Sequence, residues 1–138
     1  MTKDMAKSFL FELVSPEQLL LSEQAQEAVL PGSEGYMTIL PDHSPVMTSV
    51  TPGVITVKTA TGQMSFVVYG GFADINRHGC SLLAESAVSL EKFDEQDLER
   101  RINEARDVFN EAENDEARNK AEDFLHQLTS VQNVISTI

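Results

Sequence analysis

The chain has 138 residues, of which 41% are apolar and 23% charged, a balance typical of a folded globular protein rather than a disordered one. Its formal net charge of −12 disfavours nucleic acids and anionic membrane surfaces as partners, because both carry charge of the same sign. The single cysteine, Cys80, excludes an internal disulfide and a multi-cysteine metal site, and we interpret it as a small packing residue in a strand.

The chain contains no apolar run of about 20 residues, so we expect no direct insertion into a membrane. Residues 1–7 include two lysines, but no long apolar segment follows them and we expect no signal peptide. These features predict a protein that stays in the cytoplasm.

The first ninety residues have the pattern of short strands joined by turns. All seven glycines and all five prolines lie between Ser15 and Ser81, and both residue types favour turns and weaken helices. Apolar runs bounded by turn residues predict the early strands, in chain order, at 9–14, 19–21, 28–30 and 37–40.

Two hairpins follow in this half. Residues 53–60 alternate between two faces, Thr61-Gly62 can turn, and residues 64–69 run back. Residues 71–75 and 80–83 flank a second turn at 76–79, and we interpret Gly70-Gly71 before it as a bulge or a close backbone approach. Many short strands at this spacing predict a β-sandwich or flattened barrel over residues 1–89.

The remainder, residues 90–138, predicts two helices. Asp94 is a suitable N-cap, and Asp97 places a carboxylate in the positive first turn. Apolar residues then recur at spacings of three and four, which marks one face of a helix; they are Leu98, Ile102, Ala105, Phe109 and Ala112, and later Ala117, Ala121, Phe124, Leu128, Val131 and Ile135. Glu113-Asn114-Asp115 breaks the phase between them. We therefore expect an α+β protein: an N-terminal β-sandwich followed by a C-terminal antiparallel two-helix hairpin.

The sequence shows no evident catalytic or metal-binding pattern. It lacks a phosphate-binding glycine loop, and its three histidines, His43, His78 and His126, have no metal-ligand spacing. Asp42-His43-Ser44 contains the residue types of a catalytic triad, but adjacent side chains seldom converge as a triad requires, and flanking prolines indicate a rigid turn. A binding or assembly role is favoured over an enzyme.

Five motifs, in order and at matching spacing, resemble the epsilon subunit of bacterial F-type ATP synthases. The similarity extends over nearly the whole chain and includes the strand-rich start and the helical tail. The motifs are Leu30-Pro31-Gly32-Ser33-Glu34-Gly35, Ile39-Leu40-Pro41-Asp42-His43-Ser44-Pro45, Thr51-Pro52-Gly53-Val54, Gly70-Gly71-Phe72 and Leu82-Leu83-Ala84-Glu85-Ser86-Ala87.

The resemblance implies a non-catalytic rotor subunit of the central stalk, which couples proton-driven rotation to ATP synthesis by other subunits. It implies that the sandwich docks on the gamma subunit and on the loops of the membrane rotor ring, peripherally at the cytoplasmic face of the bacterial inner membrane. By position in the motifs, Ser15, His43 and Thr48 would contact gamma, while Glu34 and Tyr36 would contact the ring. The family often has a carboxylate where this chain has Tyr36.

For the hairpin, the resemblance implies a regulatory domain that can reach the alpha and beta subunits and inhibit ATP hydrolysis. Some family members bind ATP on the first helix; this chain keeps Asp97 and Arg100 of that motif but lacks its leading aliphatic residue and its final alanine. We therefore expect no cofactor, with ATP at most a weak regulatory ligand. The resemblance also implies that an inhibitory tail meets an acidic segment of a catalytic subunit. From Asp115 onward the only bases are Arg118 and Lys120, against four carboxylates, and repulsion between these like charges predicts weak inhibition.

The residues alone leave three alternatives open. A free-standing small-molecule binding sandwich would have a concave apolar pocket. A small hydrolase would depend on His43 of Asp42-His43-Ser44, and an assembly chaperone would leave the finished ATP synthase.

Overall fold

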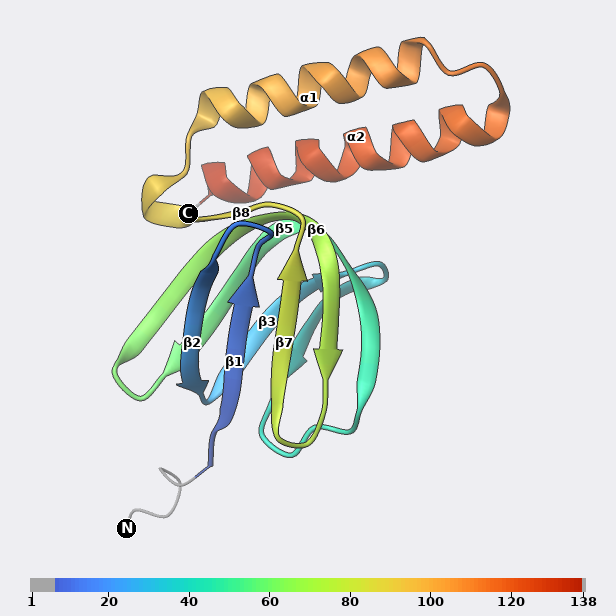
Figure 1. The fold of residues 1–138 in the computed structure, drawn as a ribbon. Coiled ribbons are helices and arrows are strands. Elements are labelled where there is room, and N and C mark those ends of the chain that lie inside the picture. The colour runs from blue at the N-terminus through green and yellow to red at the C-terminus, as the bar shows by residue number, and fades with distance from the viewer. Residues whose placement is uncertain (1–6, 138) are drawn as a thin grey trace. The chain divides into compact units, whose positions relative to one another are not determined.

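The computed structural model describes residues 7–137 and divides the chain into two compact units, Met1–Leu90 and Glu91–Ile138. The first unit holds eight strands joined in one sheet (Figure 1). They are β1 (Phe9–Val14), β2 (Leu19–Ala25), β3 (Glu27–Gly32), β4 (Gly35–Ile39), β5 (Val46–Thr59), β6 (Gly62–Ile75), β7 (Gly79–Ala84) and β8 (Ala87–Ser89). A short 3-10 turn, η2 (Leu90–Lys92), follows. The second unit consists of α1 (Glu95–Asn110) and α2 (Asp115–Ser136).

The strands of the sheet lie in the order β2-β1-β7-β6-β5-β3-β4, with β8 beside β6. The sheet folds over into two layers, and β5 and β6 belong to both. These two strands pair along their whole length. Residues 46–50 of β5 and 71–75 of β6 continue into β7, β1 and β2, which we name the first layer. The other halves of β5 and β6 adjoin β3, β4 and β8. The predicted sandwich is thus confirmed.

Several details of the strand prediction were wrong. Strand β5 begins at Val46 rather than at residue 53, β2 extends to Ala25 rather than ending at residue 21, and the short strand β8 was not predicted. The segments 64–69 and 71–75 are one continuous strand, β6, because the chain crosses between layers without leaving the sheet. The first hairpin turns at Ala60-Thr61, one residue earlier than predicted, since Thr59 pairs with Gly62.

Gly70 and Gly71 lie at the point where β6 passes between layers. Gly70 has a φ of 106°, which favours glycine, and a Cβ on Gly71 would lie 2.4 Å from the carbonyl oxygen of Leu83 on β7. The predicted close backbone approach is therefore confirmed, and glycine at position 71 allows β6 to pair with β7.

Alternate residues of the strands fill the space between the layers, as the twofold period of a strand requires. Phe11, Leu13, Leu30, Ile55 and Leu82 are among the fully buried side chains of this core. Burial of each such side chain stabilises the fold by about 1.5–3 kcal/mol. Cys80 is part of the same cluster, which confirms its predicted packing role; burial, and then the nearby Asp74 carboxylate, raises the pKa of its thiol to about 12.

The second unit is a hairpin of two amphipathic helices that pack against each other (Figure 1). Asp94 caps α1 by accepting from the Gln96 N–H at 2.9 Å, and Asn114 caps α2 by accepting from the Ala117 N–H at 2.8 Å. The predicted stripes are buried at Leu98, Ile102 and Ala105 and at Ala121, Leu128 and Val131. Three members of the predicted stripes differ: Phe124 is 42% exposed, Ala117 is exposed, and Ala112 lies beyond the end of α1. Within residues 7–137, no helix has both the length and the apolar character needed to span a membrane.

Candidate functional site

The outward face of the first layer carries a line of apolar side chains across neighbouring strands. Val14 of β1 pairs with Leu83 of β7, and Leu83 pairs with Phe72 of β6. Leu19 of β2 lies opposite Val14 at the end of this line. We name Leu19, Val14, Leu83 and Phe72 the apolar row. Leu83 is 56% exposed and Phe72 40%, because the alternate residues of β6 and β7 point into the core instead.

A second line, adjacent to the apolar row on the same face, is acidic. Glu12 of β1 pairs with Ser81 of β7, which pairs with Asp74 of β6, so two carboxylates flank one serine. We name Glu12, Ser81 and Asp74 the acidic row. Ser81 Oγ lies 3.5 Å from Glu12 Oε1, the outer limit for a hydrogen bond that the hydroxyl donates. The strand segments of the first layer include Glu12, Glu23 and Asp74 but no lysine or arginine.

The residues expected to contact gamma lie on or beside this layer. Ser15 directly follows Val14 and forms a tight turn with Gln18, whose carbonyl accepts from the Ser15 N–H at 2.9 Å. Thr48 lies on β5 and pairs with Ala73, next to the Ser49–Phe72 pair that continues the apolar row. Ser15 therefore adjoins the apolar row at Val14, whereas Thr48 lies on the core-facing side of the sheet, because its partner Ala73 belongs to the buried core. His43 lies apart from them, in the connection from β4 to β5.

The two residues expected to contact the rotor ring lie on the β3–β4 hairpin. Glu34 is exposed at its turn. Tyr36 is 52% exposed, yet its hydroxyl accepts a hydrogen bond from the backbone N–H of Val54 at 3.1 Å. Tyr36 thus combines an exposed ring face with a structural role in the sandwich.

Asp42-His43-Ser44 does not form a triad. The Asp42 carboxylate accepts from Lys7 Nζ at 2.9 Å, and this bond lowers the pKa of Asp42. His43 Nδ1 lies 2.7 Å from the backbone carbonyl oxygen of Ser44 rather than from its hydroxyl. Asp42 has a φ of 65°, which agrees with the predicted rigid turn. The arrangement offers no activated nucleophile.

On α1, Asp97 and Arg100 are occupied by contacts within the helix. The Asp97 carboxylate accepts from Arg101 Nε at 2.9 Å and also from Arg100. These hydrogen bonds, first that of Arg101, lower the pKa of Asp97 despite an opposing effect of burial. Arg100 also donates to Glu104 at 3.0 Å, and its partners, first Asp97, raise the pKa of its guanidinium. A nucleotide phosphate at Arg100 would compete with two carboxylates already bound there.

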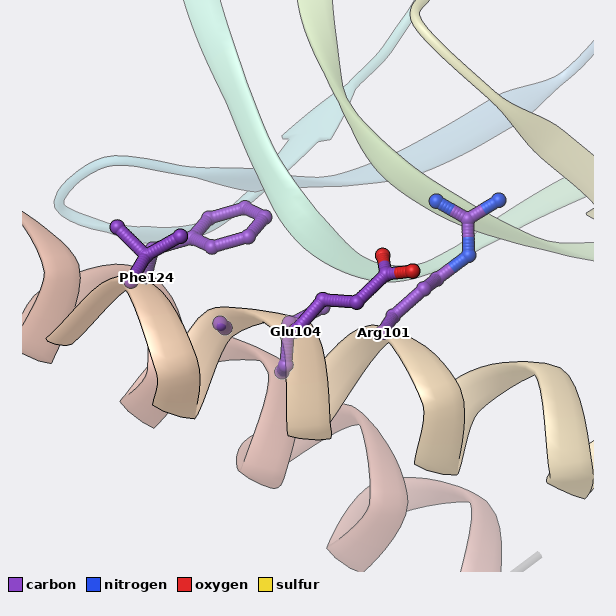
Figure 2. Close-up of a pocket in the computed structure, with 6 residues that line it drawn as sticks. Arg101, Glu104 and Phe124 are labelled. Carbon is purple, nitrogen blue, oxygen red and sulfur yellow. The ribbon is translucent and has the colours of Figure 1, made fainter. Parts of the chain in front are cut away.

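The hairpin also carries an open hollow of about 290 Å³ between α1 and α2. Figure 2 shows Arg101, Glu104 and Phe124 on the side of the hairpin that lines it. Val108, 61% exposed, and Leu128 contribute apolar walls. Within residues 7–137, no group of three or more His, Cys, Asp or Glu side chains is arranged to hold a metal ion.

The family model for the beta-sandwich domain of the ATP synthase delta/epsilon chain matches residues 8–90. Curated proteins match over almost the whole chain. The ATP synthase epsilon chain of Mesorhizobium japonicum is 56% identical over 95% of this chain and 98% of its own length. That of Brucella anthropi is 55% identical over the same shares of the two chains.

Solved structures share the fold at lower identity. A chain of the Euglena gracilis mitochondrial ATP synthase, solved as OSCP/F1/c-ring, superimposes with a TM-score of 0.72 at 23% identity, over 93% of this chain and 81% of that one. A chain from the central stalk/c-ring of the Tetrahymena thermophila mitochondrial ATP synthase gives 0.58 at 11% identity, over 88% and 94%.

Proposed function

The chain belongs to the family of ATP synthase epsilon chains, and on that premise we propose that it is a rotor subunit whose sandwich docks on the gamma subunit through the apolar row. Members of this family are non-catalytic subunits of the complex, and in that setting docking on gamma would couple rotation of the membrane ring to ATP synthesis. The subunit would be peripheral, on the cytoplasmic face of the bacterial inner membrane.

The observation that carries this proposal is the exposed apolar row. Outward Leu and Phe side chains aligned across adjacent strands form a contiguous patch, and such patches mark sites of protein–protein contact. Burying apolar surface yields about 25 cal/mol for each Å² removed from water, so a partner that covers Leu83 and Phe72 gains much of its affinity there. Ser15, next to Val14 of the row, would border the gamma contact, with Thr48 and His43 as further contacts.

Contact with the rotor ring would use the β3–β4 hairpin. Glu34 at its exposed turn supplies a charge, and the exposed face of Tyr36 supplies an apolar surface. Because the Tyr36 hydroxyl is bound to Val54, the ring-facing contact would depend on the aromatic face rather than on that oxygen.

We assign the hairpin a weak regulatory role. From Asp115 onward it has two bases and four carboxylates, so the acidic segment of a catalytic subunit that the resemblance implies as its partner would repel it. ATP fits poorly at Asp97 and Arg100, because both side chains already satisfy each other and their neighbours. A calorimetric titration of the full chain with ATP should give no saturable binding signal; submillimolar binding abolished by Arg100→Ala would contradict this.

The docking proposal is tested by measuring the affinity of the full chain for a catalytic head that contains gamma but lacks epsilon. The double variant Leu83→Ala/Phe72→Ala should bind at least about tenfold more weakly, since a few buried side chains near the centre of an interface carry most of its binding energy. Val108→Ala, which truncates a similarly exposed residue on the hairpin, is the matched control and should bind like the unmodified chain.

Both replaced residues are exposed, so circular dichroism and thermal unfolding should show little change in stability. Unaltered affinity of the folded double variant would refute docking through the apolar row. The chaperone alternative makes a different prediction, because such a chain would bind assembly intermediates and be absent from the finished ATP synthase.

A further inference from the structure

The charged side chains on the strands of the first layer are all negative, and this limits which partners can cover the layer. Its strand segments carry Glu12, Glu23 and Asp74 and contain no lysine or arginine. Among the described residues, neither Glu12 nor Asp74 forms an ion pair: each salt bridge of the sandwich uses Asp42 or Glu27 instead. The layer therefore presents uncompensated negative charge beside an exposed apolar row.

The register of the strands fixes how these charges are spaced. Glu12 and Asp74 are both direct neighbours of Ser81, on opposite sides, so their backbones lie two strand spacings or about 10 Å apart. Ser81 between them is short, half-buried and carries a hydroxyl. A cationic side chain that enters above Ser81 would be within reach of a carboxylate on either side and of the serine oxygen.

We propose that the surface of the gamma subunit that covers the first layer pairs an apolar ridge with a lysine or arginine, and that this cation is held between Glu12 and Asp74 above Ser81. The apolar ridge lies on Val14, Leu83 and Phe72, and the cation occupies the adjacent acidic row. This inference rests on the docking proposed above. It adds the chemistry that selects the partner, because the acidic row disfavours an apolar surface that is neutral or negatively charged.

Other occupants fit this pattern less well. A second copy of this chain would bring the same acidic row and a net charge of −12 against itself. Nucleic acid and anionic lipid carry the same sign as the two carboxylates and would be repelled. A protein surface that combines apolar side chains with a basic one complements both the apolar row and the acidic row.

The test compares the affinity of the full chain for the gamma-containing, epsilon-free head at low and at high ionic strength. For the unmodified chain, binding should weaken as salt is added, because exposed charge pairs are screened. Glu12→Gln/Asp74→Asn, which keeps the shape of both side chains, should bind about three- to tenfold more weakly at low salt and lose most of the salt dependence. Glu12→Lys/Asp74→Lys should weaken binding further.

Glu27→Gln is the matched control, since it neutralises a carboxylate on β3, outside the first layer. It should leave both the affinity and its salt dependence as in the unmodified chain. Circular dichroism and thermal unfolding of each variant establish that the fold is retained.

The outcomes separate the two proposals. If the unmodified chain binds the head but the neutralised variant has equal affinity and equal salt dependence, the acidic row has no role and only this inference fails. If the unmodified chain does not bind the head, docking fails and this inference with it. Concentration-dependent dimers in sedimentation, lost in Leu83→Ala/Phe72→Ala, would assign the surface to a second copy and overturn the inference.

Discussion

The hydroxyl of Tyr36 accepts a hydrogen bond of 3.1 Å from the backbone N–H of Val54, on a strand that is not its ladder partner. The regular pairing of β3 with β5 is interrupted between Val29 and Gly32, and Tyr36 provides an acceptor to β5 within this interruption. Gly53 makes room, since a Cβ there would lie 2.8 Å from the Tyr36 hydroxyl and 2.7 Å from Pro31. The tyrosine therefore stabilises the β3–β4 hairpin on the sandwich.

Replacing Tyr36 by Phe should lower the free energy of unfolding by about 1–2 kcal/mol, because a part-buried backbone N–H loses its acceptor. Chemical denaturation monitors this change, and Thr38→Ala on the same strand, an exposed position, is the control. Because Phe keeps the aromatic face, the proposed contact with the rotor ring should persist in the folded variant. A stability equal to that of the unmodified chain would show that water replaces the hydroxyl at no cost.

The sequence was sufficient to predict the sandwich and the hairpin, because turn residues are confined to the first part and helical periodicity to the second. The cap Asp94 could be predicted, and the cap Asn114 lies within the predicted break at 113–115, since a cap is a local property of a few residues. The continuity of β6 through Gly70-Gly71 could not be predicted from the sequence, because a glycine pair indicates the end of a strand as readily as a crossing between layers.

The apolar row was not predicted, although each member was visible. Val14, Leu83 and Phe72 become neighbours only through the parallel β1–β7 pairing and the β6–β7 register, which no local pattern specifies. One signal was available: Leu82-Leu83 places apolar residues on both faces of a strand whose inner face alone needs to be buried. For Tyr36, the resemblance predicted a contact with the rotor ring, but nothing in the sequence indicated the hydrogen bond of its hydroxyl to Val54.

The ion pairs of Asp97 make the stability of the hairpin dependent on pH. In the folded chain the pKa of Asp97 is lowered from its ordinary value of 3.8, first by the hydrogen bond from Arg101. A lowered folded-state pKa means that the stabilisation is present above about pH 4 and is lost as the pH falls through the folded-state value. The temperature at which the hairpin unfolds, followed by its ellipticity at 222 nm, should therefore fall as the pH is lowered through this acidic range.

Asp97→Asn should remove that part of the acid sensitivity and cost on the order of 0.5–1 kcal/mol at neutral pH, a small value because the pair is partly exposed to solvent. Asp107→Asn, on the same helix and outside this cluster, is the matched control. If both variants had the same acid profile as the unmodified chain, the Asp97 pairs would not contribute to the stability of the hairpin.

The hairpin should be a weak inhibitor of ATP hydrolysis. The full chain and a version ending at Leu90, where the first compact unit ends, are titrated into an epsilon-free catalytic head. Both should bind, and neither should suppress hydrolysis strongly, because the second helix is acidic. Glu122→Lys/Asp123→Lys, which reverses two of its charges, should increase inhibition.

Strong suppression by the full chain but not by the shorter version would show that the hairpin inhibits despite its charge. In that case contacts other than charge, such as those of the exposed Val108 and Phe124, would have to provide the affinity.

The most direct test of docking through the apolar row is site-specific photo-crosslinking in the assembled ATP synthase. A photoreactive amino acid replaces Leu83, the exposed centre of the row, and in a parallel sample it replaces Thr38 on the edge strand β4. The account predicts that position 83 cross-links to gamma and that position 38 does not. A complex that assembles normally but gives no gamma cross-link from position 83, or an equal one from position 38, would contradict it.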